Sequence, residues 1–183
     1  MVALIPTVSA EQVERDQRRA DPATAELWKL LDAVHDPEVP VLSLWDLGVL
    51  RDIEKQDDKI IVTLTPTYSG CPAIKTMAED VEAALRAAGY NDVDIRNQLA
   101  PAWTTDWLSP EGHRKLKEYG IAPPQESSTC RDSRSPMGKE PSVPCPQCGS
   151  SNTRKISEFG STACKALYQC EDCHEPFDYF KCL

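Results

Sequence analysis

The chain has 183 residues, a hydrophobic content of 40%, a charged content of 27% and a formal net charge of −9. These values are ordinary for a globular protein of one or two domains. The acidic balance argues against a general nucleic-acid or anionic-membrane binder, because such proteins present a basic surface. No apolar run approaches the roughly 20 residues that a membrane-spanning helix needs.

The beginning of the chain does not resemble a secretory signal. Residues 1–6 contain no basic side chain, and acidic residues follow closely at positions 11, 14 and 16. In a protein that is not exported, cysteines usually remain reduced or bind metal. We therefore expect a cytoplasmic protein whose eight cysteines are thiols or metal ligands rather than a disulfide framework.

The first helix is predicted to begin at Asp21. Residues 1–20 are mostly polar and charged, and we expect them to form a frayed tail. Asp21 and Pro22 supply an N-cap and a proline at the first helical position. Apolar residues then recur at helical spacing as far as Val34.

An extended acidic segment follows at residues 36–48. Two prolines keep it out of a helix. It carries three carboxylates, those of Asp36, Glu38 and Asp46, among apolar side chains. Carboxylates in this setting bind metal, act as bases or cap backbone N–H groups, and capping is the ordinary role of such residues beside turns.

A hairpin and a crossover helix are predicted next. Residues 49–54 and 59–65 read as two strands, with a turn between them. Helical spacing then runs from Pro72 to about Ala88, and Gly89 provides a stop. A third strand is expected within residues 93–99. The order helix, strand, strand, helix, strand predicts a small α+β sandwich in which helices cover one face of the sheet.

Cys71 lies between the second strand and the crossover helix. Proline is favoured at the first helical position, which places Cys71 at or next to the N-cap. Free backbone N–H groups and the helix dipole favour the thiolate there, and the thiolate attacks electrophiles or binds metal. The alternative is a small buried residue in a turn, because free cysteines are often buried.

Residues 101–110 contain two tryptophans, Trp103 and Trp107, which we expect to pack on their own domain rather than on a partner. A short helix is then predicted from Ser109 to Gly120. From residue 123 to residue 143 the chain is rich in serine, proline and charge, which is typical of a linker.

Two C-x-x-C pairs follow the linker, with 21 residues between them. This spacing is close to that of zinc ribbons, in which two tight turns supply four thiolates to one tetrahedral ion. A closed site of this kind is structural, and about 40 residues need it because they cannot build a sufficient core alone. The predicted zinc ligands are Cys145, Cys148, Cys170 and Cys173.

Three cysteines remain after this assignment. Cys164 and Cys182 lie within the ribbon, as a second metal or cluster site or as buried inert thiols. Cys130 lies in the linker and is unassigned. The predicted organisation is an assembly domain over residues 21–121, a linker over 122–143 and a zinc ribbon over 144–183.

Three motifs together resemble the SufT-like domain of iron–sulfur cluster assembly. They are residues 36–40 (DPEVP), 46–48 (DLG) and 65–72 (TPTYSGCP), and they lie in the family's order within about residues 24–100. The later segments resemble a narrower family, the PaaD-type accessory subunits of the phenylacetyl-CoA oxygenase (1,2-epoxidase) system. These segments are residues 101–107 (PAWTTDW), 117–121 (KEYGI), 156–168 (ISEFGSTACKALY) and 175–182 (EPFDYFKC).

The resemblance implies an accessory role rather than ring chemistry. In that system a diiron oxygenase and a flavin/iron–sulfur reductase perform the epoxidation, and the PaaD-type protein helps to mature or insert the iron–sulfur cluster. The resemblance thus implies protein partners, especially the reductase, and neither nucleic acid nor membrane. The chain shows no paired Glu-x-x-His helices and no glycine-rich dinucleotide loop, which agrees with that division.

By the family motif, Cys71 is the key thiolate and binds iron or a cluster transiently. The resemblance implies supporting roles around it for Asp36, Glu38, Asp46, Thr67 and Ser69. Structural zinc in the ribbon and transient iron or a cluster at Cys71 are the expected metals.

Two other interpretations remain open. The chain can be a structural docking subunit with an inert Cys71, or a thiol enzyme. An enzyme needs a base within reach of the nucleophile, and the sequence offers only His35.

Overall fold

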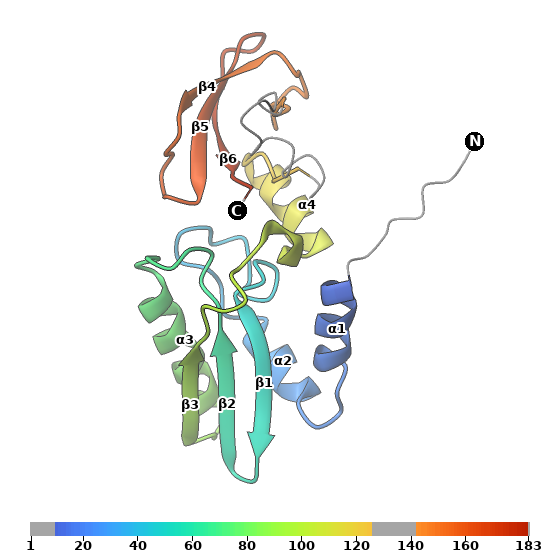
Figure 1. Ribbon diagram of the computed structural model, residues 1–183, viewed down its shortest axis with the longest axis vertical. Helices are drawn as coiled ribbons and strands as arrows, with labels where there is room; N and C mark the ends of the chain where they lie inside the picture. The colour runs from blue at the N-terminus through green and yellow to red at the C-terminus, as the bar shows by residue number, and fades with distance from the viewer. Residues whose placement is uncertain (1–9, 126–141, 183) are drawn as a thin grey trace, which may run out of the picture.

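The computed structural model describes residues 10–125 and 142–182 of the chain (Figure 1). Cys130 and most of the predicted linker lie outside the described residues, so the three domain boundaries stay a prediction. The helices are α1 (Ala10–Arg19), α2 (Ala25–Leu31), α3 (Ile74–Ala87), the short 3₁₀ helix η1 (Thr105–Trp107) and α4 (Pro110–Tyr119). The strands are β1 (Leu50–Gln56), β2 (Lys59–Leu64), β3 (Asp92–Asn97), β4 (Thr153–Ser157), β5 (Lys165–Cys170) and β6 (Pro176–Phe180).

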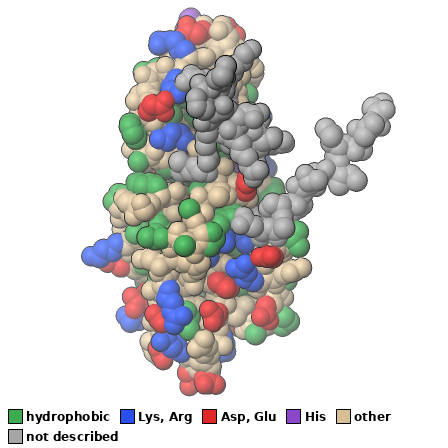
Figure 2. Space-filling model, in the orientation of Figure 1, with side chains coloured by type: hydrophobic (Ala, Val, Ile, Leu, Met, Phe, Trp, Pro, Cys, Tyr) green, Lys and Arg blue, Asp and Glu red, His purple; other side chains and the backbone are tan. Residues whose placement is uncertain are grey.

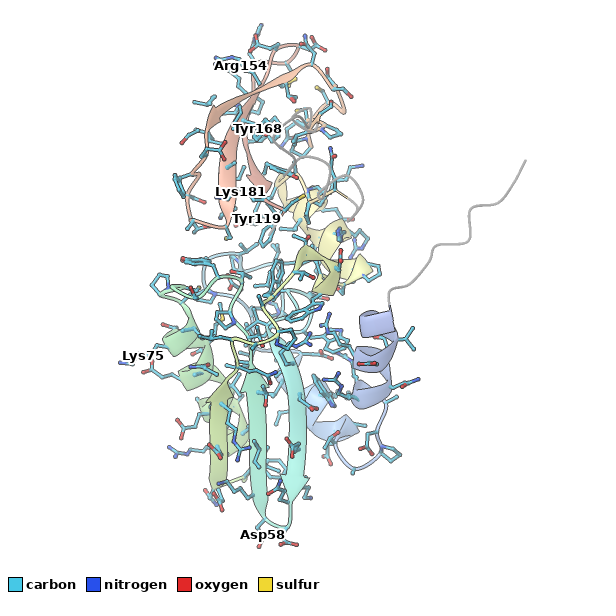
Figure 3. The ribbon with its side chains drawn as sticks, viewed as in Figure 1. Asp58, Lys75, Tyr119, Arg154, Tyr168 and Lys181 are labelled. Atoms are coloured by element: carbon cyan, nitrogen blue, oxygen red, sulfur yellow. The ribbon has the colours of Figure 1, made fainter. Side chains whose placement is uncertain are left out.

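The first sheet confirms the predicted hairpin and sandwich. Its strand order is β1-β2-β3, with β1 antiparallel and β3 parallel to β2. Because parallel neighbours need a crossover, α3 connects β2 to β3, and α2 and α3 lie on the same face of the sheet (Figure 1). Alternate residues of β2 (Ile60, Val62 and Leu64) are buried in the main hydrophobic core. Lys75 on α3 points away from the sheet (Figure 3).

The predicted frayed tail is wrong over residues 10–19, which form α1. Arg15 explains why, because its side chain is fully buried although the helix is polar in sequence. Its guanidinium donates to the backbone carbonyls of Trp107 and Trp45 and lies 4.4 Å from the centre of the Trp45 ring. The contacts that hold α1 therefore come from residues far along the chain.

The ribbon forms a second three-stranded sheet, with strand order β4-β5-β6 and antiparallel neighbours. It has a small core of its own, in which Tyr168 packs against Phe177 and Tyr179 at 5.9 and 5.5 Å between ring centres. Among the described residues, no helix is both long and apolar enough to cross a membrane.

The ribbon rests directly on the first domain (Figure 1). Ala122, in the predicted linker, donates to Asp178 O and accepts from Phe180 N, at 2.8 and 2.9 Å. The Phe180 ring lies 6.1 Å from Trp103, and both side chains belong to the main core. Trp103 and Trp107 are buried in the main core, as expected for packing on their own domain, and Trp103 also packs against Phe180 of the ribbon.

The predicted short helix is also confirmed, as α4. Ser109 caps its first turn by accepting a hydrogen bond from Gly112 N at 2.8 Å, and Gly120 ends it with φ of 90°. Tyr119, at the end of α4, and Lys181, after β6, lie near the junction of the two domains (Figure 3). Hydrophobic side chains gather near this junction on the face shown in Figure 2.

Candidate functional site

Cys71 lies in the turn that connects β2 to α3. The turn is closed by a bond from Cys71 N to Tyr68 O at 3.1 Å, and α3 begins at Ile74 rather than at Pro72. The backbone N–H groups of Ala73 and Ile74 lower the pKa of the Cys71 thiol. Ile74 N also donates to the Cys71 carbonyl at 3.4 Å, so the amides at this helix start are not reserved for the sulfur.

The predicted resting thiolate at Cys71 is wrong. The side chain is only 7% exposed and belongs to the main hydrophobic core. Burial raises the pKa of the Cys71 thiol, the charges of Glu38 and Asp36 raise it further, and the two backbone N–H groups oppose this only in part. Loss of hydration outweighs the helix-start effect, so the protonated thiol is favoured.

The two carboxylates that raise the pKa of Cys71, those of Asp36 and Glu38, have different local roles. Asp36 is buried, and its Oδ1 accepts hydrogen bonds from the backbone N–H groups of Glu38 and Val39, at 2.8 and 2.6 Å. It caps its own turn, whereas Glu38 is half-buried. Burial raises the pKa of both carboxyl groups. The charges of both groups also act on the Cys71 thiol.

The rest of the turn contributes less. Thr67 is half-buried and Ser69 is exposed, so their supporting roles stay a prediction. Tyr68, whose pKa is raised mainly by burial and then by the charge of Cys71, was not predicted from the sequence. The one feature of the sequence that could have indicated Tyr68 is that it lies within the motif at residues 65–72.

Asp46 belongs to a different network. Its carboxylate accepts from Ser43 Oγ at 3.0 Å, from Ser109 Oγ at 2.8 Å and from Lys115 Nζ at 2.6 Å. Burial opposes ionisation of Asp46, but these bonds outweigh it and hold the pKa of the carboxyl below its ordinary value. Asp46 thus anchors α4 to the acidic segment.

This network predicts a pH-dependent stability. We expect Asp46→Asn to lower the free energy of unfolding by about 1.5–3 kcal/mol at neutral pH, because it removes hydrogen bonds to a charged group. The folded-state pKa lies below the ordinary 3.8. The carboxylate therefore stabilises the fold above about pH 4, and this contribution is lost as the pH falls through the folded pKa.

Urea unfolding at a series of pH values measures this difference. The gap between Asp46→Asn and the parent protein should narrow below about pH 4. Asp94→Asn is the control, because Asp94 forms exposed ion pairs with Lys59 and Arg96. A gap that stays constant down to about pH 2.5 would contradict the role of the ionised carboxylate.

The four predicted zinc ligands come together as one group. Their sulfur atoms all lie within 4.8 Å of one another, with Cys145–Cys173 and Cys148–Cys170 at 3.7 and 3.5 Å. A tetrahedral ion with bonds of about 2.3 Å to sulfur needs separations of about 3.8 Å. The pKa of the Cys170 thiol is lowered to about 7, mainly because its sulfur accepts a hydrogen bond from the backbone N–H of Cys173. The donor set therefore fits a thiophilic metal ion.

The structure does not unite Cys164 with Cys182. Cys182 is disulfide-bonded, whereas the other six described cysteines are free. The expectation that every cysteine is a thiol or a metal ligand is therefore wrong for Cys182. Cys164 packs in the main core, and Cys182 packs against the ribbon's own core. The site expected from these two residues is not formed.

Comparison with known proteins decides the family. A protein of Escherichia coli that is named, provisionally, as a subunit of 1,2-phenylacetyl-CoA epoxidase is 48% identical over 164 residues, which are 90% of this chain and 96% of that protein. The chain belongs to the PaaD family. Residues 129–181 match the family model of the PaaD zinc beta ribbon domain, and residues 24–95 match that of an iron–sulfur cluster assembly protein.

More distant relatives cover about half of this PaaD-family chain. An Fe-S protein maturation auxiliary factor of Porphyromonas gingivalis is 33% identical over 90 residues, 48% of this chain and 85% of that protein. A solved DUF59 domain of unknown function from Bacillus anthracis is 22% identical, with a TM-score of 0.47, over 57% of this chain and 95% of that one. The family comparison confirms both resemblances found in the sequence.

Proposed function

We propose that this chain is an accessory subunit of the phenylacetyl-CoA epoxidase system and helps to assemble or insert the iron–sulfur cluster of the reductase component. One observation carries the proposal. A single chain joins a region that matches iron–sulfur assembly proteins to a PaaD ribbon, and it matches the Escherichia coli epoxidase protein over nearly its whole length.

Cys71 is the residue that would hold the iron or cluster. A cation at this position would replace the thiol proton. The negative charges of Asp36 and Glu38, which disfavour a bare thiolate, would then stabilise the bound cation. Cys71 is buried, but Gly70 and Pro72 on either side of it are exposed. Cargo would therefore enter through a small movement of this turn.

The four ribbon cysteines would hold zinc. Zinc bound by four thiolates has no open coordination position, so the ion would stabilise the ribbon and take no part in the transfer. The proposed role is therefore non-catalytic. His35, the only base that the sequence suggests, is exposed, and its Nδ1 is hydrogen-bonded to the Pro40 carbonyl at 2.8 Å.

Cys71→Ser tests the proposal. We expect the variant to fold and to bind its protein partners, because serine differs by one atom. The iron and sulfide content of the reductase should fall when the two are produced together in cells. Metal and sulfide analysis of the purified reductase measures this, with Lys75→Ala, an exposed residue of α3 outside the proposed site, as the control. Equal loading with the parent and with Cys71→Ser would refute the role of Cys71.

The burial of Cys71 favours a second candidate, a structural docking subunit of the epoxidase complex. In that case Cys71→Ser would leave cluster content unchanged, and removal of the whole chain would weaken assembly of the other subunits. Size-exclusion chromatography of the complex, with and without this chain, separates the two candidates.

A further inference from the structure

Strand β6 lies between the two hydrophobic cores of the protein. It is an edge strand of the ribbon sheet, and successive side chains of a strand point to opposite faces. Phe177 and Tyr179 belong to the ribbon's own core, whereas Phe180 belongs to the main core of the first domain and is 1% exposed. The Phe180 ring lies 6.1 Å from the ring of Trp103. The ribbon therefore contributes an aromatic side chain to the core of the other domain.

The loop between β4 and β5 makes a second contribution of this kind. Cys164, at the end of this loop, is 5% exposed and is also a member of the main core. Every other buried residue of that core, apart from Phe180, comes from residues 27–121. The Cys164 carbonyl accepts a hydrogen bond from Lys181 N at 2.9 Å, which holds the loop to the end of β6. Both side chains therefore occupy the main core only while the ribbon sheet is folded.

The two cores meet in the chain between residues 121 and 122. Ile121 is buried in the main core, and its neighbour Ala122 is buried in the ribbon's core. Ala122 also pairs with β6 through both of its backbone groups. Its N–H donates to Asp178 O at 2.8 Å, and its carbonyl accepts from Phe180 N at 2.9 Å. The strand that carries Phe180 is therefore fixed to the backbone that follows α4.

The metal centre of the ribbon also meets this junction. Gln147 lies between Cys145 and Cys148 in the first C-x-x-C turn. Its side-chain amide nitrogen packs against Gly120, 3.1 Å from the position that a Cβ atom would take there. Gly120 ends α4, the helix that is bonded to Asp46 in the first domain. The turn that supplies two of the metal ligands is therefore in direct contact with the first domain.

We propose that zinc binding by the ribbon stabilises the first domain through this junction, so that the metal state of the ribbon sets the stability of the assembly domain. The inference rests on the proposed zinc site. A ribbon of this size does not stay folded without its ion. Loss of the ion would unfold the sheet, withdraw Phe180 and Cys164 from the main core and expose Trp103 to water. The first domain would stay folded but become less stable, because most of its core comes from its own residues.

Tryptophan fluorescence tests the effect on the first domain alone, because all four tryptophans of the chain lie within residues 28–107. The full-length, zinc-loaded protein is compared with the same protein after anaerobic removal of zinc by a chelator. We expect chelation to shift the emission to longer wavelength, because Trp103 is only 4% exposed in the folded protein. It should also lower the midpoint of thermal unfolding by at least about 5 °C, as expected for the withdrawal of one buried aromatic side chain. Added zinc should restore both signals.

Phe180→Ala separates the junction from the metal site. Phe180 is not part of the ribbon's own core, so the variant should bind zinc as the parent does while its tryptophan midpoint falls. Because the junction is already weakened, chelation should then lower the midpoint of the variant by less than about half of the shift seen in the parent. Phe159→Ala is the matched control, because this phenylalanine of the ribbon is 65% exposed. It should match the parent in zinc content, midpoint and chelation shift.

A tryptophan transition of the parent that is the same with and without zinc would overturn the coupling, and this comparison needs no variant. A Phe180→Ala protein with the midpoint and the chelation shift of the parent would also overturn it, because β6 would then not connect the two domains energetically. If the parent binds no zinc, the zinc site and the coupling are both refuted. The proposed role in cluster assembly is decided separately, by the cluster content of the reductase produced with Cys71→Ser.

Discussion

Replacing Cys148 by serine is expected to release the ribbon's metal ion and to unfold residues 144–182. The ribbon core is small, and its other support is its contact with the first domain. Structural zinc contributes about 10–16 kcal/mol in zinc-finger peptides, far more than such a core supplies. Metal analysis and limited proteolysis measure the result, and both should show a folded first domain, which has its own core.

Ser161→Ala is the control, because Ser161 is an exposed residue of the ribbon whose hydroxyl donates to Asp178 at 2.8 Å. It should keep one metal ion per chain and the protease resistance of the parent. A Cys148→Ser protein that retains a stoichiometric metal ion and a folded ribbon would contradict the assignment. The absence of zinc from the parent protein, purified without chelator, would refute zinc as the bound metal.

The second large effect is expected at Arg15. We expect Arg15→Ala to lower the free energy of unfolding by about 2–4 kcal/mol, because two buried carbonyls lose their donor at about 1–3 kcal/mol each. The buried guanidinium also packs on the Trp45 ring. The pKa of Arg15 is lowered to about 10, mainly by burial and then by the charge of Arg51. Keeping the guanidinium charged in this position is therefore itself unfavourable, and for this reason the expected loss of unfolding free energy is moderate. Chemical denaturation measures the difference.

Arg18→Ala is the matched control on the same helix. Arg18 is partly exposed and forms longer ion pairs with Glu14 and Asp52, at 3.5 and 3.9 Å. Exposed pairs of this kind contribute about 0–1 kcal/mol. Equal losses for the two variants would show that the buried guanidinium does not anchor α1.

Several elements were predictable because their signals are local. The hairpin of β1 and β2, the amphipathic α3, the serine cap and glycine end of α4, and the two C-x-x-C turns each depend on residues a few positions apart. Periodicity and capping report such short-range preferences directly. The family motifs, in addition, predicted the order of the assembly domain and the ribbon along the chain.

The failures have one physical cause. α1 was missed because its polar sequence has little apolar face, and the residues that bind Arg15 lie up to 92 positions away. The ionisation state of Cys71 was predicted from the helix start alone, but burial by distant segments dominates its pKa. The hydrogen-bond partners of Asp46 could not be read from its motif, because Ser109 and Lys115 lie 63 and 69 positions away.

The sequence by itself determined most of the secondary structure, the four-cysteine metal group and the membership of the PaaD family, because these depend on spacing and on residue identity. Only the tertiary structure decided that Cys71 is a buried thiol and that Cys164 lies in the same core. Burial and electrostatic environment are properties of packing, which brings together segments that the chain order separates.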